Sequence, residues 1–233
     1  MKIFGLTLLI AMIFCSTTFA AEIQPPTISV SGDGSVEIAP DRATISVSVV
    51  TRDKNPSDVQ NSNARAAKSV IDSIVALGID RKNISTGNYN FNPTYRHFDN
   101  GRNEIDGYEA TNSVTVIVDD LNLVGKIIDT ALKHGANQVN SLNFGLRDKK
   151  IHENEALKLA ISDARRKAEV AASALGVSIV GVRNVSINSS SVVQPRNMKL
   201  ARVAANDSID AETPIESGTV KCSASVHIEF EIR

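Results

Sequence analysis

The last segment of the chain alternates apolar and polar residues without a break over residues 220–232. Side chains of a β-strand point in turn to the two faces of its sheet, so this pattern predicts a strand with one buried and one exposed face. The apolar set includes Cys222, and the polar set includes His227. The rest of the chain has further predicted strands, which are joined as hairpins or through single helices, and this arrangement fits an α+β fold with a mainly antiparallel sheet.

Three helices are predicted between the strands. Apolar residues recur at helical spacing in three segments that each end at a glycine, and Asn55 and Asp120 stand at the expected N-caps of the first two. The predicted helices span 55–78, 120–135 and 151–175. The element order is β-β-α-β-β-α-β-α-β-β, a mainly antiparallel sheet with three helices, whose middle part has the order of a split βαβ unit. The predicted buried stripe of the third helix consists of Leu157, Ala160, Ile161, Ala164, Ala168, Ala171, Ala172 and Leu175.

The sequence SGDGS at 31–35 interrupts the first alternating segment. A phosphate-binding loop would need a following Lys-Ser or Lys-Thr and a helix that supplies amide donors, and neither follows these glycines. Two glycines around an acidic residue are typical of tight turns. The pattern therefore predicts a hairpin turn here.

Residues 1–20 have the features of a secretory signal peptide, with an uncleaved anchor as the alternative. Lys2 precedes an apolar run at 3–14, which is shorter than the ~20 residues that span a bilayer. Phe14 stands where a lipoprotein signal has a small residue before its cysteine, so lipid attachment is not predicted. The exported chain, 21–233, is interpreted as a single domain with a long irregular loop or arm at 189–218.

The chain is nearly neutral, with 25 Lys and Arg against 26 Asp and Glu. This balance provides no field that would attract nucleic acid or an anionic membrane. Signal cleavage would remove Cys15 and leave Cys222 as a single cysteine. Such a thiol is buried, paired between chains, or reactive, and its place on the apolar face of a strand favours burial.

Cys222 and His227 are five positions apart, an odd number, so a strand places them on opposite faces. They are therefore not predicted to form a nucleophile and base, which must be in hydrogen-bond contact. The other histidines, His97, His134 and His152, lack the short spacings of a zinc site. No catalytic, cofactor-binding or metal-binding residue is predicted, although convergence in three dimensions remains an alternative for a metal.

Two segments carry residues that are typical of protein interfaces. Five of the seven aromatic residues beyond the signal peptide lie in the predicted hairpin at 89–108, together with arginines. The alternative is that these aromatics pack on their own domain. The arm at 189–218 is too apolar for a pure linker, and either docks on a neighbouring subunit or forms a mobile loop. The predicted interface residues are Tyr89, Phe91, Tyr95, Arg96, Phe98, Arg102, Tyr108, Met198 and Leu200.

Four segments of the chain resemble the SIMPL-domain family, and in particular its bacterial periplasmic members. These segments are 28–49, 107–146, 164–182 and 224–232, so the resemblance covers about residues 27–233 in order and spacing. The resemblance implies an exported α+β protein of the Gram-negative cell envelope without established enzymatic residues. It also implies a link to stress tolerance and to immune recognition by hosts, and some relatives form large hollow oligomers.

Three hypotheses about function follow. The first is an exported, periplasmic, non-catalytic protein that self-assembles and protects or scaffolds the envelope under oxidative stress, with outer-membrane association left open. The second is a binding module for an envelope protein or small ligand, which uses the hairpin at 89–108 and the arm at 189–218. The third is a thiol redox protein that uses Cys222, and it ranks last because a buried cysteine without a resolving partner is a poor catalyst.

Overall fold

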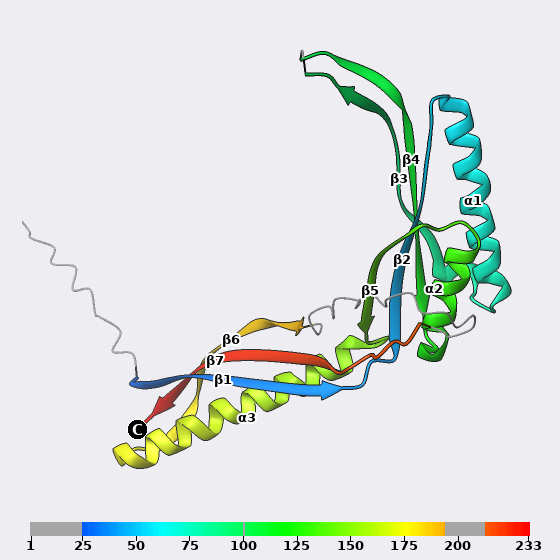
Figure 1. The fold of residues 1–233 in the computed structure, drawn as a ribbon. Coiled ribbons are helices and arrows are strands. Elements are labelled where there is room, and N and C mark those ends of the chain that lie inside the picture. The colour runs from blue at the N-terminus through cyan, green and yellow to red at the C-terminus, as the bar shows by residue number, and fades with distance from the viewer. Residues whose placement is uncertain (1–24, 100, 194–212) are drawn as a thin grey trace, which may run out of the picture.

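The chain forms two antiparallel sheets, each covered on one face by helices (Figure 1). The computed structural model describes residues 25–99, 101–193 and 213–233, so the predicted signal peptide lies outside the described residues. The elements in chain order are β1 (Thr27–Ile38), β2 (Arg42–Asp53), α1 (Pro56–Ala76), η1 (Arg81–Asn83), β3 (Ile84–His97), β4 (Asn103–Val118), η2 (Leu121–Leu123), α2 (Val124–Lys133), β5 (Gln138–Gly145), α3 (Lys149–Leu175), β6 (Ile179–Val193) and β7 (Val220–Ile232). This order confirms the predicted α+β class with three helices.

The sheet with the strand order β3-β4-β2-β5 and the helices α1 and α2 together form what we name the hairpin unit. Strands β2 and β3 both pair antiparallel with β4, which lies between them, so α1 connects two parallel strands across a third. In the same way α2 connects β4 to β5 across β2. This is the predicted split βαβ arrangement. Its core is aliphatic and includes Ile45, Val47, Val70, Ile74, Val114 and Ile127.

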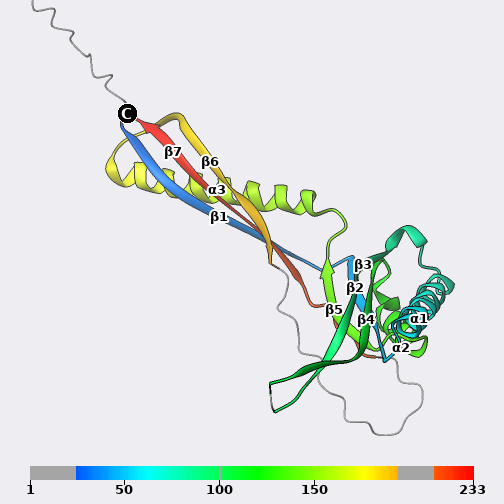
Figure 2. The ribbon, with the colours of Figure 1, turned by 90° about the horizontal axis from the view of Figure 1, so that it is seen from above.

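The sheet with the strand order β1-β7-β6 and the helix α3 form what we name the α3 unit (Figure 2). The first and the last strand of the chain pair without a register shift, from Thr27 opposite Glu231 to Ile38 opposite Val220. The even-numbered residues of β7 from Val220 to Phe230 are buried, as the alternation predicts. Strand β6 continues to Val193, so residues 189–193, which were predicted to begin an irregular arm, belong to a strand.

The predicted hairpin turn at 31–35 is wrong, because Gly32 and Gly34 lie inside the continuous strand β1. Both glycines face α3 at very short distance. A β-carbon on Gly32 would stand 2.1 Å from the carbonyl oxygen of Ala160, and one on Gly34 would stand 2.2 Å from that of Ala156. The glycines therefore allow close packing of helix and strand, which is a known role of glycine within strands.

The predicted buried stripe of α3 is wrong at two of its three large residues, whereas Leu157 is partly buried against the core of this unit. Ile161 and Leu175 are 40% and 69% exposed, respectively. A helix this close to a strand admits only small side chains at the contact, so the larger apolar residues lie on its flanks. The buried positions are alanines at every fourth residue: Ala156, Ala160, Ala164, Ala168 and Ala172.

The helix ends follow the capping signals of the sequence. The Asn55 side chain accepts a hydrogen bond from the Ser57 amide at the start of α1, as predicted. Asp120 caps the short turn η2 that precedes α2, rather than α2 itself. Gly176 ends α3 in the left-handed conformation, with a φ of 70°.

The two units are joined by contacts around the start of β2 and around α2. Asp41 accepts a hydrogen bond from the Arg147 amide at 2.6 Å. Residues 213–219 lead back to β7 across α2, where Thr213 donates from its amide and its hydroxyl to the carboxylate of Asp129, at 3.2 and 2.7 Å. Ile215 packs against the core of the hairpin unit. The chain before β7 is therefore fixed to the hairpin unit.

Candidate functional site

The β3–β4 hairpin extends away from the rest of the hairpin unit (Figure 1). The predicted interface residues Tyr89, Phe91 and Tyr95 lie on β3, and Tyr108 lies on β4. The exposed fractions are 48% for Tyr89, 37% for Phe91 and 53% for Tyr95. Phe98 in the turn and Ile105 on β4 are 41% and 56% exposed. Sequence reasoning missed Ile105, which is the cross-strand partner of Tyr95.

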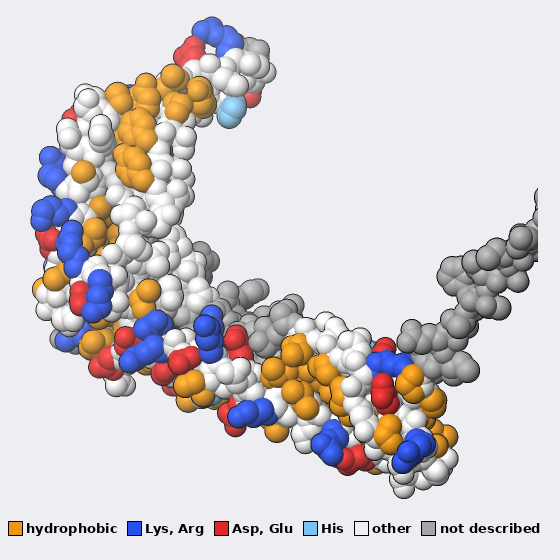
Figure 3. Space-filling view, turned by 180° about the vertical axis from the view of Figure 1, so that it is seen from behind, with side chains coloured by type: hydrophobic (Ala, Val, Ile, Leu, Met, Phe, Trp, Pro, Cys, Tyr) orange, Lys and Arg blue, Asp and Glu red, His pale blue; other side chains and the backbone are white. Residues whose placement is uncertain are grey.

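These aromatic residues continue the buried face of the four-stranded sheet. Phe91 pairs with Ala110, which is fully buried, and residues at every second position of β4 from Ala110 lead to Val114 in the core. Cross-strand partners share a face of the sheet, so the aromatics lie on the side that α1 covers further along. The hairpin thus presents an apolar core face that no described element covers, and Figure 3 shows hydrophobic side chains gathered on it.

The polar residues of the hairpin are paired with one another. Arg96 forms an ion pair with Asp106 at 2.8 Å, and Arg102 forms one with Glu104 at 2.6 Å. The rings of Phe91 and Tyr108 stack with their centroids 5.8 Å apart. The structure therefore brings seven of the predicted interface residues onto one hairpin, with its arginines paired to acids. Met198 and Leu200 lie outside the described residues.

A second uncovered apolar surface lies on β6. Val182, Val185 and Ile187 are 55%, 46% and 57% exposed. Their partners on β7 are Phe230, Ile228 and Val226, which are buried against α3. Helix α3 packs mainly on β1 and β7, so the row on β6 extends beyond its cover. A groove of about 540 Å³ lies between the C-terminal part of α3 and the start of β6, where Val182 and Phe230 line it.

Cys222 is fully buried beside Val220 and Leu146. Burial raises the pKa of its thiol, and nearby Glu153 raises it further. His227 points to the other face of the same strand, where it contacts Ser29 and Ser31. The predicted separation of thiol and imidazole is therefore confirmed.

The contact between His227 and two serines was not predicted. The Nε2 atom lies 3.3 Å from the Ser29 hydroxyl, and the Nδ1 atom lies 3.2 Å from the Ser31 hydroxyl. Both ring nitrogens are thus engaged by hydroxyls, whereas a triad base uses one nitrogen for the nucleophile and the other for an orienting acid. The alternating serines of β1 could have indicated this contact with His227, but only if the pairing of β1 with β7 had been known.

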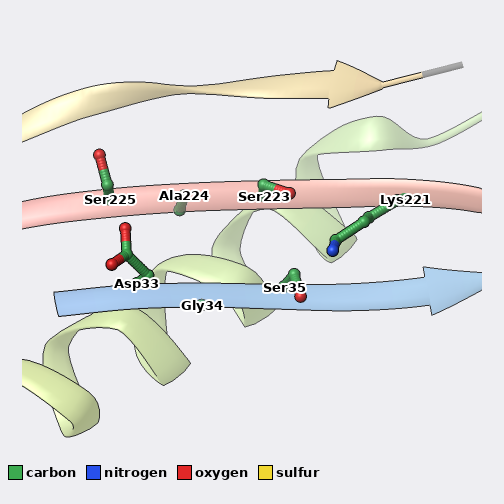
Figure 4. A pocket seen from close by; sticks show the side chains of 7 residues that line it. All are labelled: Asp33, Gly34, Ser35, Lys221, Ser223, Ala224 and Ser225. Carbon is green, nitrogen blue, oxygen red and sulfur yellow. The ribbon is translucent and has the colours of Figure 1, made fainter.

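A shallow hollow of about 340 Å³ lies further along the same open face (Figure 4). Its residues come from the neighbouring strands β1 and β7, and its charged groups are Asp33 and Lys221. Its one carboxylate, one ammonium and several hydroxyls give a polar surface, on which Asp33 lies opposite Ser225 across the two strands. The lining consists of Asp33, Gly34, Ser35, Lys221, Ser223, Ala224 and Ser225.

The remaining histidines are dispersed. His97 contacts Asn103 in the hairpin, His134 contacts the Thr130 carbonyl at the end of α2, and His152 lies in α3. Within the described residues, no three His, Cys, Asp or Glu side chains are grouped so as to hold a metal ion. In the same part of the chain, every helix is too short or too polar to cross a membrane.

Residues 28–230 match the SIMPL family, which is described as a protein of unknown function (DUF541). The 26 kDa periplasmic immunogenic protein of Brucella melitensis is 32% identical over 97% of this chain and 94% of its own length. The protein of the same name from Brucella abortus is 31% identical over the same shares. The uncharacterized protein YggE of Escherichia coli K12 is 26% identical over 89% of this chain and 83% of its own length. The periplasmic names agree with the predicted location, and the chain belongs to the SIMPL family.

Proposed function

We propose that this protein is a non-catalytic periplasmic protein that assembles with further copies of itself and protects or scaffolds the envelope under oxidative stress. The aromatic hairpin carries the proposal. Four partly exposed aromatic side chains and Ile105 present on the order of 400 Å² of apolar surface there. Apolar patches of a few hundred Å² on a monomer often mark an interaction site.

The charges of the hairpin favour an apolar, self-complementary contact. Arg96 and Arg102 are each paired with an acid of the same hairpin, so the charges of both arginines are balanced locally. The chain as a whole has a formal net charge of −1. Such a surface has no excess of one sign with which to select a strongly charged partner.

Two features support a non-catalytic role over thiol chemistry. Cys222 has no exposed surface, and burial raises the pKa of its thiol, so the reactive thiolate is disfavoured. His227 lies on the opposite face of β7, between two serine hydroxyls. A redox role for Cys222 would therefore require the strand to open.

The assembly is tested by light scattering on purified residues 21–233 at micromolar concentration. We expect a mass of several copies for the wild type and a monomer for the Tyr95→Ser, Ile105→Ser double variant. The matched control is Asn90→Ser with Asn92→Ser, which changes two residues of β3 between the aromatic positions. A wild type that stays monomeric contradicts self-assembly, and would favour another envelope protein as the partner of the same hairpin.

The stress role is tested by survival in peroxide. A strain without the gene is complemented with the wild type, the hairpin double variant or the matched control. We expect protection from the wild type and the control, and its loss with the hairpin variant. Equal survival of all strains, including the one without the gene, would contradict a role in oxidative stress.

A further inference from the structure

We propose that the ion pair between Asp163 and Lys167 of α3, which we name the edge pair, is an autoinhibitory contact that keeps β1 from adding a strand of another molecule. The edge pair lies on a different unit from the aromatic hairpin, so this inference goes beyond the proposed function. A strand at the edge of a sheet presents unpaired backbone N–H and C=O groups, and an extended segment of another chain can be added to them.

The edge strands of the two sheets are β1, β6, β3 and β5, and they differ in regularity. The pairing of β6 shifts register three times, that of β3 shifts twice, and that of β5 shifts once. Such irregularities discourage the addition of a further strand. The pairing of β1 with β7 runs over 12 residues without a shift. Within the described residues, β1 is therefore the one edge strand that pairs regularly along its whole length.

Helix α3 lies close enough to β1 to act on its outer edge. Leu159, Asp163 and Lys167 follow one another at every fourth position, so they form one row along the helix. A β-carbon on Gly34 would stand 2.8 Å from that of Leu159, which places this row beside β1. The glycines of β1 thus bring the edge pair within reach of the strand backbone.

The edge pair supplies the two hydrogen bonds that a neighbouring strand would make at this point. The Asp163 carboxylate accepts a hydrogen bond from the Asp33 amide at 3.2 Å, as a strand carbonyl would. The Lys167 ammonium donates to the Ser31 carbonyl at 2.9 Å, as a strand amide would. Both backbone groups point away from β7, since only alternate residues of an antiparallel strand bond to a given partner. The edge pair therefore occupies the place of a strand.

The two side chains are held in position by each other and by Arg166. The Lys167 ammonium lies 2.7 Å from the Asp163 carboxylate, and the Arg166 guanidinium lies 2.6 Å from it. A strand that approaches β1 would have to break the bonds of the edge pair to the backbone. It would also meet the charge of Lys167, and lysine at a sheet edge is a common means of preventing strand addition.

The strand that this edge could add has a defined chemistry. It must be extended, and it must carry small side chains toward α3, because the helix lies against the backbone of β1 at Gly32 and Gly34. The segment TISVSGDGSVEI of β1 itself meets both conditions, since its glycines would leave the same room beside the helix. A fluorescein-labelled synthetic peptide of this sequence is therefore the probe.

The test compares two double variants of α3. The edge variant is Asp163→Ala with Lys167→Ala, which keeps good helix formers at both positions. The matched control is Arg165→Ala with Glu169→Ala. This control removes an ion pair of the same helix at the same spacing, but these two side chains line the groove beside β6. Thermal unfolding verifies that both variants are folded.

Binding of the peptide to purified residues 21–233 is measured by fluorescence anisotropy. We expect the peptide to bind the edge variant, and to bind neither the wild type nor the control at the same concentrations. Hydrogen exchange then locates the peptide. The amides of Ser29 and Ser35 alternate with the inward groups of β1 as that of Asp33 does, and they should exchange more slowly in the edge variant when the peptide is present. Equal binding to the wild type and the edge variant, or binding to neither, overturns the proposal.

A third substitution distinguishes a freed edge from a general loosening of the fold. Ser35→Pro removes an outward backbone N–H of β1, and proline is tolerated at such a position of an edge strand. Added to the edge variant, Ser35→Pro should abolish peptide binding. Binding that persists would show that the peptide binds elsewhere, which also overturns the proposal. Each comparison is made with the wild type in whatever state of assembly it has, so these outcomes do not depend on the proposed function.

Discussion

Gly32 of β1 lies so close to α3 that a β-carbon at this position would stand 2.1 Å from the carbonyl oxygen of Ala160. The same carbon would stand 2.5 Å from the amide nitrogen of Ala164. Both neighbours are backbone atoms, which cannot rotate away. The α3 unit is thus built on direct contact between a helix and the backbone of a strand, and this contact decides which residues both elements tolerate.

We expect Gly32→Ala to destabilise the protein by about 3 kcal/mol, at the upper end of the cost of overpacking, because helix and strand must move apart. Urea denaturation at neutral pH measures this change in the free energy of unfolding. The control is Gly145→Ala at the end of β5, where an added β-carbon has no atom within 4 Å. Equal stability of the two variants would contradict the close packing.

Local patterns predicted the elements of this fold, but not how distant elements meet. The alternation of β7 and the helical spacing of α1 each depend on one segment, and both are confirmed. The role of Gly32 depends on α3, which lies more than a hundred residues away in the sequence. A glycine in a turn cannot be distinguished by its local sequence from a glycine that packs under a helix. The repeat of alanine at every fourth residue of α3 was the signal that could have decided between them.

The same limit applies to the candidate site. The density of aromatic residues predicted the hairpin as a surface of interest, and the exposure of Tyr89 and Tyr95 agrees with it. Ile105 and the row on β6 were not predicted, because their exposure depends on where α1 and α3 stop covering the sheets. An apolar residue on a strand is expected to be buried unless the position of its covering helix is known.

Asn63→Ala is expected to destabilise the protein by about 2 kcal/mol, because it removes two buried hydrogen bonds to backbone carbonyl groups. The buried Asn63 amide donates to the carbonyl oxygens of Val49 and Ala110, at 3.0 and 3.1 Å, and so ties α1 to the base of the hairpin. Urea denaturation of the variant measures the loss. Asn61→Ala, on the exposed face of the same helix, should change stability by less than about 0.5 kcal/mol. Similar losses for both would contradict an anchoring role for Asn63.

Cys222 is expected to resist thiol reagents in the folded protein. It is fully buried, and burial raises the pKa of its thiol, so both access and thiolate formation are limited. Labelling with a maleimide should be complete in denaturant and slow under native conditions. Cys222→Ser should cost about 1–3 kcal/mol of stability, since it places a hydroxyl in an apolar site. Rapid stoichiometric labelling of the native protein would contradict this assignment and revive the redox hypothesis.

Asp163 is expected to make stability depend on pH in the acid range. It lies on α3 beside the edge of β1, where it forms ion pairs with Lys167 and Arg166 at 2.7 and 2.6 Å and accepts the Asp33 amide at 3.2 Å. Lys167 in turn donates to the Ser31 carbonyl at 2.9 Å. The Asp163 and Lys167 side chains thus form hydrogen bonds with backbone groups on the outer edge of β1. Unpaired backbone groups at the edge of a sheet can pair with a strand of another chain.

The hydrogen bonds from Lys167, from Arg166 and from the Asp33 amide lower the pKa of Asp163 to about 2, from an ordinary value of 3.8. A carboxyl whose pKa is depressed on folding adds stability above its unfolded pKa and loses it as the pH falls through the folded one. Thermal unfolding should therefore give Asp163→Asn a lower melting temperature than the wild type at pH 6. This difference in melting temperature should fade between about pH 4 and pH 2. Asp72→Asn, whose carboxylate lies exposed on α1, serves as the control. A difference between Asp163→Asn and wild type that is unchanged at pH 2 would show that the carboxylate charge is not what stabilises this edge.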